Sequence, residues 1–237
     1  MKNNFIAVLD SGIGGISTLI ELKKSLPNQS YVYFGDNANA PYGQKSNREI
    51  FSGLINGLIQ IREFSPSHVV LACNTLSVNI RKKIEDFLGV ETLGVFPPVE
   101  SHLINGKKTL LIATPKTIEN YNNVKGLDAV SLPYLAGEIE RFKFSLKAVN
   151  VKKHLTKILP CYDTVILGCT HYFFVKNQII DHLKPLKLDS GNNYLIKKIL
   201  CELNTSITPK IISENQTIFI GSNSIENKLF FDGVVNE

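Results

Sequence analysis

Two distant segments of the chain share one pattern. Residues 68–75 read HVVLACNT, and residues 164–171 read TVILGCTH. Each is a continuous apolar run that ends in a small residue, a cysteine and two polar residues, and each precedes an amphipathic stretch. Such a run is typical of a parallel strand that helices cover on both faces. The repeat therefore predicts two related α/β lobes, each built on its own buried sheet.

Strand-like and helix-like stretches alternate along the rest of the chain. Arg48–Phe64 and Leu76–Leu88 place apolar residues three or four positions apart, as amphipathic helices do. Strands that alternate with helices predict βαβ units and a mainly parallel sheet flanked by helices in each lobe. The predicted strands are Phe5–Leu9, Tyr31–Phe34, His68–Ala72, Thr92–Val95, Thr109–Ala113, Ala129–Leu132, Thr164–Gly168 and Thr217–Ile220.

Two turn-rich segments divide the chain. The FPP sequence at residues 96–98 follows a predicted strand and suits a crossover between lobes. A second crossing is predicted near residues 188–192, because DSGNN at 189–193 consists of turn-forming residues. We therefore predict a first α/β domain made of residues 1–95 plus 189–237, a second made of residues 96–188, and a cleft between them.

Composition excludes several classes of protein. The 237 residues are 43% hydrophobic and 20% charged, as in ordinary globular proteins. The net charge of +5 is scattered, without the basic and aromatic interleaving of a nucleic-acid-binding face. No apolar run approaches the ~20 residues of a membrane span, and the N-terminal segment lacks the apolar core of a secretory signal. We expect a cytoplasmic protein that binds neither nucleic acid nor membrane.

The cysteines divide into two pairs by their surroundings. The spacing of Cys73, Cys161, Cys169 and Cys201 matches no CxxC or zinc-ligand motif, so no metal site is predicted. Cys161 and Cys201 lack a polar neighbourhood, and we expect them to be small buried hydrophobic residues. Cys73 and Cys169 end the two matching strands, which points to a chemical role for both.

Polar residues gather where the predicted strands end. Ligands of open α/β sheets bind at the carboxyl ends of the strands. If the two lobes face each other, these strand ends line one cleft, with one thiol from each lobe. The strand-end residues are Asp10, Ser11, Cys73, Asn74, Thr75, Thr114, Cys169, Thr170 and His171.

Two thiols in one cleft suit the inversion of a stereocentre next to a carboxylate. That reaction removes a proton from one face and delivers a proton to the other, so a thiolate and a thiol can exchange roles. A free thiol has a pKa of ~8.5 and benefits from a helper. His171 is the natural partner of Cys169, and Asp10 can pair with Cys73. The two faces of the site should therefore differ chemically.

The run GIGG at residues 12–15 does not predict a nucleotide site. It matches neither GxGxxG nor GxxxxGK[ST]. The glycines are better explained by a tight backbone turn that approaches a small anion. The remaining histidines, His68, His102, His154 and His182, have no comparable setting and are assigned to the core or the surface.

Taken together, the motifs resemble those of the glutamate racemase family, in the aspartate/glutamate racemase superfamily. The matching segments are AVLDSGIGGIS, YFGDNANAPYGQKS, VVLACNTLS, IATPKTIENY, VILGCTHY and LDSGN, in that order. The resemblance implies two α/β domains around a cleft and interconversion of L- and D-glutamate without pyridoxal phosphate or a metal. It also implies supply of D-glutamate for peptidoglycan synthesis, and we expect a homodimer.

The resemblance also implies roles for individual residues. Cys73 and Cys169 match the catalytic cysteines, and Asp10 and His171 match the groups that assist them. Glu140 falls where the family has a further assisting glutamate, with Glu138 as a competing candidate. The matched substrate-binding positions are Asp10, Ser11, Tyr42, Gly43, Asn74, Thr75, Thr170 and His171, joined by Thr114 and Thr117 in a further carboxylate-binding loop.

Two alternatives stay open at this point. The same pair of thiols would serve another acidic amino acid, such as aspartate. Asn39 and Phe173 depart from the usual family pattern, which leaves room for a non-catalytic amino-acid-binding protein on the same fold. The sequence also does not assign either thiol to one enantiomer.

Overall fold

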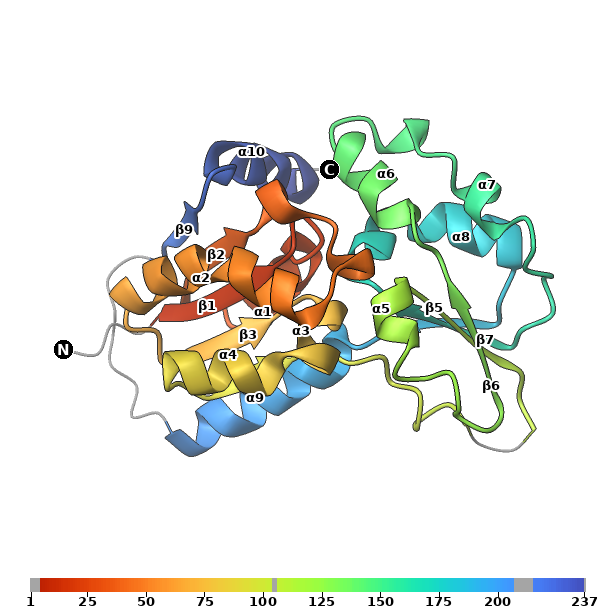
Figure 1. The fold of residues 1–237 in the computed structure, drawn as a ribbon, viewed down its shortest axis with the longest axis horizontal. Helices are drawn as coiled ribbons and strands as arrows, with labels where there is room; N and C mark the ends of the chain where they lie inside the picture. The colour runs from red at the N-terminus through yellow and green to blue at the C-terminus, as the bar shows by residue number, and fades with distance from the viewer. Residues whose placement is uncertain (1–4, 104–105, 207–214, 237) are drawn as a thin grey trace.

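The computed structural model describes residues 5–103, 106–206 and 215–236, and its ribbon forms two lobes that lie side by side (Figure 1). The strands are β1 (Phe5–Asp10), β2 (Ser30–Gly35), β3 (His68–Leu71), β4 (Thr92–Gly94), β5 (Thr109–Ala113), β6 (Leu127–Ser131), β7 (Thr164–Gly168), β8 (Lys187–Ser190) and β9 (Thr217–Ile220). The α-helices are α1 (Ile16–Ser25), α2 (Asn47–Glu63), α3 (Asn74–Asn79), α4 (Arg81–Leu88), α5 (Pro115–Ile118), α6 (Leu135–Arg141), α7 (Val151–Leu155), α8 (Lys176–Leu183), α9 (Asn192–Ser206) and α10 (Ser224–Val235). Short 3-10 helices are η1 (Asn37–Asn39), η2 (Tyr42–Gln44), η3 (Leu146–Ala148) and η4 (Thr170–Val175).

The two sheets share one topology. The first lobe has the strand order β4-β3-β1-β2-β9, the second has β6-β5-β7-β8, and every strand pairing is parallel. The order β2-β1-β3-β4 of the first sheet therefore corresponds strand for strand to β6-β5-β7-β8 of the second. The predicted fold class, two pseudo-symmetric α/β lobes, is confirmed. In each sheet the order in which strands are added switches sides beside the first strand, β1 or β5, and open sheets bind ligands at such switch points.

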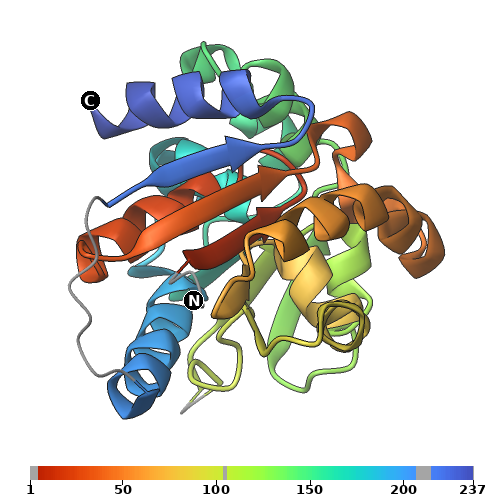
Figure 2. The same cartoon turned by 90° about the vertical axis from the view of Figure 1, so that its left-hand side faces the viewer.

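Helices cover both faces of the sheets (Figures 1 and 2). In the first lobe α1, α9 and α10 pack on one face, while α2, α3 and α4 pack on the other. In the second lobe α6, α7 and α8 cover one face and α5 covers the other. One apolar cluster contains Ile13 and Ile16 of the first lobe together with Leu135, Ile139 and Tyr172 of the second. The lobes are therefore packed against each other through a shared core.

Local signals explain where the helices begin and end. At the start of α2, the Ser46 hydroxyl accepts from the Glu49 N–H and the Glu49 carboxylate accepts from the Ser46 N–H. Such a capping box contributes about 1 kcal/mol. The prediction of one helix over residues 76–88 was wrong, because α3 and α4 are separate. The Asn79 side chain donates to the Thr75 carbonyl at 2.9 Å and competes with continuation of α3.

Strand β8 occupies a segment that we expected to be a turn. It pairs with β7 and extends the second sheet to Ser190, two residues beyond the sequence-based boundary at 188. Its residues are half-buried or exposed at the sheet edge, and its sequence has no apolar run that would predict a strand. The chain returns to the first lobe at Gly191. A Cβ there would lie 2.1 Å from the Phe96 carbonyl oxygen, so the two crossovers touch.

The other predicted strands all lie within two residues of their expected bounds. The buried apolar runs of β1, β2, β3, β5 and β7 are long enough to be read directly from sequence, whereas β6 and β9 are half-buried or exposed strands at the sheet edges. Within the described residues, no helix combines the length and the hydropathy of a transmembrane span.

Candidate active site

Both strand-end cysteines line one cavity between the lobes. Cys73 follows β3, Cys169 follows β7, and both thiols are buried. The cavity measures about 10 Å³. A volume of roughly 10–15 Å³ is the least that holds one water molecule, so the lobes are closed around the site. The lining residues are Ser11, Pro41, Tyr42, Gly43, Cys73, Asn74, Thr75, Thr114, Ala136, Cys169, Thr170 and His171.

His171 connects Cys169 to a carboxylate. Its Nδ1 lies 3.8 Å from the Cys169 sulfur, and its Nε2 lies 2.7 Å from Glu140 Oε1. Burial by itself lowers the pKa of His171, but the contacts with Cys169 and Glu140 raise that pKa well above its usual value. The imidazole therefore lies between the Cys169 sulfur and the Glu140 carboxylate and is within reach of both.

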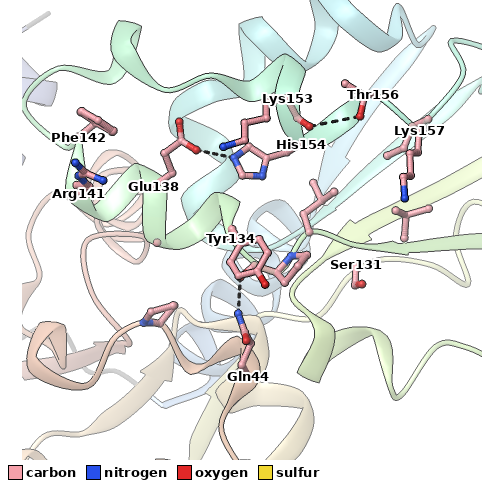
Figure 3. Close-up of a pocket in the computed structure, with 16 residues that line it drawn as sticks. Gln44, Ser131, Tyr134, Glu138, Arg141, Phe142, Lys153, His154, Thr156 and Lys157 are labelled. Carbon is pink, nitrogen blue, oxygen red and sulfur yellow. Dashed lines mark hydrogen bonds and ion pairs between the residues drawn. The ribbon is translucent and has the colours of Figure 1, made fainter.

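Glu140 is held by both lobes. Its Oε1 also accepts from the Ile13 N–H at 2.7 Å, and its Oε2 accepts from Asn37 Nδ2 at 3.3 Å. Burial would raise the pKa of Glu140, but the hydrogen bond and the charge of His171 hold it below its usual value. Glu138, the competing candidate, lies outside the site. The Glu138 carboxylate contacts His154 Nε2 at 2.6 Å (Figure 3).

Cys73 has different surroundings. Its sulfur lies 3.9 Å from the Ser11 hydroxyl. Burial and the charge of Asp10 raise the pKa of Cys73 to about 12. Burial also raises the pKa of Asp10, whose carboxylate accepts from the Gly12 N–H at 2.9 Å and from Thr170 Oγ1 at 3.1 Å. Asp10 thus acts on Cys73 through its charge. No Asp10–Cys73 hydrogen bond is found among the described residues, where the Cys73 sulfur contacts the Ser11 hydroxyl instead.

Three threonine hydroxyls form a cluster across the lobe boundary. Thr75 Oγ1 lies 3.1 Å from that of Thr114 and 3.3 Å from that of Thr117, and the latter two lie 3.2 Å apart. Close by, Oδ1 of buried Asn74 has no hydrogen-bond partner in the part of the chain that the structure describes. Hydroxyl groups can donate to a carboxylate, and the amide oxygen can accept from an ammonium group.

The glycine-rich loop lets the second lobe approach the first. A Cβ on Gly12 would lie 1.7 Å from Glu140 Oε1, and one on Gly14 would lie 2.5 Å from His171 Nδ1. A Cβ on Gly43 would lie 2.6 Å from Thr114 Cβ. The sequence predicted that the GIGG run approaches a small anion. In the structure, the anion against this loop is the Glu140 carboxylate, which belongs to the protein itself.

Sequence reasoning missed residues that follow β2. The Tyr42 hydroxyl donates to Asp36 in a short hydrogen bond, and Asn37 donates to Glu140. Asp36 comes directly after β2, so the strand-end rule used for Asp10 and Cys73 would also have found it. Pro41 and Ala136 line the cavity without a chemical signal in the sequence.

The other two cysteines are exposed, so the prediction that Cys161 and Cys201 are buried was wrong. Cys161 lies in the loop before β7, and Cys201 lies on the outer face of α9. One group among the described residues has donor atoms for a metal ion: His68, Glu91 and Glu202 bring one ligand atom each within 4.8 Å. It lies where β3 and β4 begin, at the opposite end of the sheet from the cavity.

Comparison with known proteins identifies the family. The chain is 30% identical to the glutamate racemase of Campylobacter concisus over 93% of this chain and 90% of the relative. It is 33% identical to the glutamate racemase of Aliivibrio fischeri strain MJ11 over 78% of this chain and 76% of the relative. The crystal structure of Escherichia coli glutamate racemase in complex with L-glutamate and the activator UDP-MurNAc-ala matches with a TM-score of 0.76 and 25% identity, covering 99% and 94% of the two chains. No protein-family model matches the chain. The coverage and identity of these relatives show that the chain belongs to the glutamate racemase family.

Proposed function

We propose that this chain interconverts L- and D-glutamate without a cofactor, with Cys73 and Cys169 as its two acid–base groups. The observation that carries the proposal is that two buried thiols from different lobes line one cavity. Membership of the glutamate racemase family supports glutamate as the small-molecule substrate. The cellular role that follows is supply of D-glutamate for peptidoglycan synthesis.

The proton transfers of racemisation suit two thiols that differ in protonation state. One thiolate removes the α-proton from one face of the substrate, and the other thiol protonates the opposite face, so the substrate keeps its composition. The raised pKa of His171 supplies a protonated imidazole 3.8 Å from the Cys169 sulfur, while burial and Asp10 raise the pKa of Cys73 to about 12 and keep that sulfur as a thiol. Cys169 therefore starts as the base and Cys73 as the acid. Turnover of the opposite enantiomer requires the reverse protonation.

The cavity offers complementary groups for an acidic amino acid. The hydroxyls of Thr75, Thr114 and Thr117 suit a carboxylate, because hydroxyl donors can reorient toward an anion. Asn74 Oδ1 in the cavity lining, and the Asp10 carboxylate that accepts from the lining residue Thr170, suit the α-ammonium group, which has only donors. None of the described lining residues is a lysine or an arginine. Apart from the protonated His171, the described lining would therefore balance substrate charge by hydrogen bonds and dipoles.

Catalysis also requires movement of the lobes. A cavity of about 10 Å³ does not admit an amino acid, so the lobes must separate during entry and release. We take the two lobes, built on the sheets β4-β3-β1-β2-β9 and β6-β5-β7-β8, as the two moving domains, hinged near Phe96 and Gly191. Closure restores the Ile13–Glu140 contact and excludes water from the reacting proton.

We also infer a cytoplasmic homodimer. A reducing compartment suits an enzyme whose two thiols must remain free. Apolar side chains of α10 are exposed in the single chain, among them Ile225 and Leu229 at 76% and 58%, and they offer a surface for a second copy. Light scattering of the purified protein tests the dimer, and a monomer at working concentration would contradict it.

The decisive experiment is incubation of L-glutamate with purified protein in deuterated water under reducing conditions. NMR follows deuterium at the α-carbon, and circular dichroism follows loss of optical activity. We expect both signals. Glutamate that binds without α-exchange would indicate a non-catalytic binding protein. Faster exchange with aspartate than with glutamate would overturn the proposed substrate.

A further inference from the structure

A line of hydrogen bonds runs from helix α10 to the active site. The buried side chain of Asn227, on α10, donates from Nδ2 to Asn37 Oδ1 at 2.8 Å. Asn37, in η1, donates in turn from Nδ2 to Glu140 Oε2 at 3.3 Å. Glu140 Oε1 contacts His171 Nε2 at 2.7 Å, and the other nitrogen of that ring faces Cys169. Side chains from four separate elements therefore connect α10 to one of the two thiols.

The contact with Asn37 decides how the Glu140 carboxylate is turned. Rotation about the last side-chain bond of a glutamate is broad, because such a torsion lacks three sharply separated wells. Oε1 already serves the His171 ring and the Ile13 N–H, and rotation of the carboxylate would move this oxygen away from both. Asn37 is the donor that holds the other oxygen. This contact therefore fixes the plane of the carboxylate, and with it the position of Oε1.

The two asparagine amides have one favourable orientation. An amide donates through its nitrogen and accepts through its oxygen, so turning the group over exchanges the two roles. The nitrogen of Asn37 must face Glu140, because an amide oxygen placed there would repel the carboxylate. Asn37 Oδ1 then points toward α10, where Asn227 Nδ2 supplies the donor that this oxygen needs. Asn227 therefore keeps the Asn37 amide from turning over.

Packing alone does not explain an asparagine at position 227. The side chain is fully buried, and its Oδ1 has no hydrogen-bond partner among the described residues. A buried polar atom without a partner is destabilising, so an apolar side chain would suit a position that served packing only. Neighbouring residues of α10 hold the helix in place against the second lobe. Glu226 pairs with Lys143 at 2.9 Å, and the Phe230 ring packs edge-on against that of Phe174 at 5.0 Å.

We propose that Asn227 and Asn37 are positioning residues for the His171 imidazole, acting through the Glu140 carboxylate. The inference rests on the proposed racemase function, because it gives the two amides a part in preparing the group beside Cys169. Neither amide lines the cavity, so neither touches the substrate. Loss of either amide lets the carboxylate turn and weakens its hold on the imidazole. Proton transfer at Cys169 then slows, while substrate affinity changes little.

Nuclear magnetic resonance of the histidine rings tests this proposal without turnover. Two-bond proton–nitrogen spectra of the full chain across pH give the pKa of each of its five histidines, and a His171→Gln sample identifies the His171 signals. Asn227→Ala and Asn37→Ala should each lower the pKa of His171, because a carboxylate that is free to turn spends less time against the ring. Asn37 is only half-buried, so its variant keeps the test available if Asn227→Ala fails to fold. An unchanged or raised pKa of His171 in the folded variants would overturn the proposal.

Two further variants separate positioning from packing. Asn236→Ala removes an exposed amide at the end of α10, which donates to the Asp232 carbonyl at 2.7 Å, and should leave the pKa of His171 unchanged. Asn227→Leu fills the buried space without a donor and should behave like Asn227→Ala. Recovery of the parental pKa of His171 in Asn227→Leu would make Asn227 a packing residue and overturn the proposal. The charged side chains that act on Glu140 are the same in every variant: His171, Lys143 and Asp10.

Kinetics of the same variants give the second readout. In Asn227→Ala and Asn37→Ala, kcat for L-glutamate should fall about three- to tenfold, the usual effect of one hydrogen bond, with a smaller change in KM. In the Glu140→Gln background Asn227→Ala should lower kcat no further, because its effect passes through that carboxylate. An equal fall in both backgrounds would contradict the proposal. A parent protein without α-proton exchange would refute the racemase function, whereas the spectra would still report on the position of the imidazole, so the two failures are distinct.

Discussion

The Nε2 atom of His171 lies 2.7 Å from a carboxylate oxygen of Glu140, which leaves Nδ1 of the same ring facing the Cys169 sulfur at 3.8 Å. The same Glu140 oxygen accepts the N–H of Ile13 from the other lobe. The orientation of the imidazole beside Cys169 is therefore coupled to closure of the lobes. An open arrangement that breaks the Ile13 contact loosens the carboxylate that holds the ring.

Replacing the Glu140 carboxylate should change how kcat depends on pH. Contact with Cys169 and Glu140 raises the pKa of His171. The stability that the His171–Glu140 ion pair adds to the folded state is therefore present at low pH and is lost as pH rises through the raised pKa of His171. The pKa of Glu140 is lowered, so at acid pH the ion pair stops stabilising the folded state as pH falls through the lowered pKa of Glu140. Glu140→Gln removes the charge that favours imidazolium. We expect the alkaline limb of the pH–kcat profile to move to lower pH.

Steady-state kinetics of Glu140→Gln across pH measure this shift, and kcat should fall at least ~tenfold given the usual size of acid–base effects. Glu85→Gln, which removes a carboxylate from the surface ion pairs of α4, is the control and should leave the limb in place. A shifted limb in Glu138→Gln instead would reverse the assignment of the two glutamates.

Removal of either buried thiol should abolish racemisation, because the reaction needs a proton acceptor and a proton donor. Cys73→Ser and Cys169→Ser should each lower kcat by ~10³-fold or more. Cys161→Ser and Cys201→Ser alter exposed thiols and are matched controls with near-parental activity. Polarimetry of L-glutamate gives the rates. Substantial turnover by either Cys73→Ser or Cys169→Ser would refute the mechanism with two thiols.

A methyl group in the glycine-rich loop should oppose closure of the lobes. In Gly14→Ala the new Cβ would lie 2.5 Å from His171 Nδ1, and in Gly12→Ala it would lie 1.7 Å from Glu140 Oε1. We expect a large loss of kcat/KM with a smaller change in Tm, since each lobe keeps its own sheet. Gly233→Ala, in α10, meets no atom within 4 Å and should leave activity unchanged. It should stabilise the helix by roughly 0.5–1 kcal/mol.

The threonine cluster should contribute to substrate affinity. Thr117→Val keeps the shape of the side chain but removes a hydroxyl that lies 3.2–3.3 Å from its two neighbours. A buried hydrogen bond to a charged group contributes ~1.5–3 kcal/mol, so the KM for glutamate should rise about tenfold or more. Thr117→Ser restores the hydroxyl and should recover most of the affinity. An unchanged KM in Thr117→Val would remove this cluster from the binding site.

The sequence alone determined the two parallel sheets and the polar residues at their edges. Each central strand is a local apolar run, and the end of a strand fixes the sheet edge at which the next side chain lies. The adjacent sequence was therefore enough to place four residues at the edges of the sheets: Asp10, Cys73, Thr114 and Cys169. Strand β8 could not, because its sequence KLDS holds a single apolar residue and therefore no apolar run.

Only the tertiary structure decided which residues meet across the lobes. Glu138 and Glu140 stand two positions apart on α6, so at 3.6 residues per turn they point about 200° apart. The sequence cannot say which of these faces turns toward the cleft. Packing of α6 against the first lobe sets Glu140 beside Ile13 and His171 and leaves Glu138 beside His154. The close approach of Gly12 and Gly14 has the same origin, because it depends on how two separately folded sheets are positioned in space.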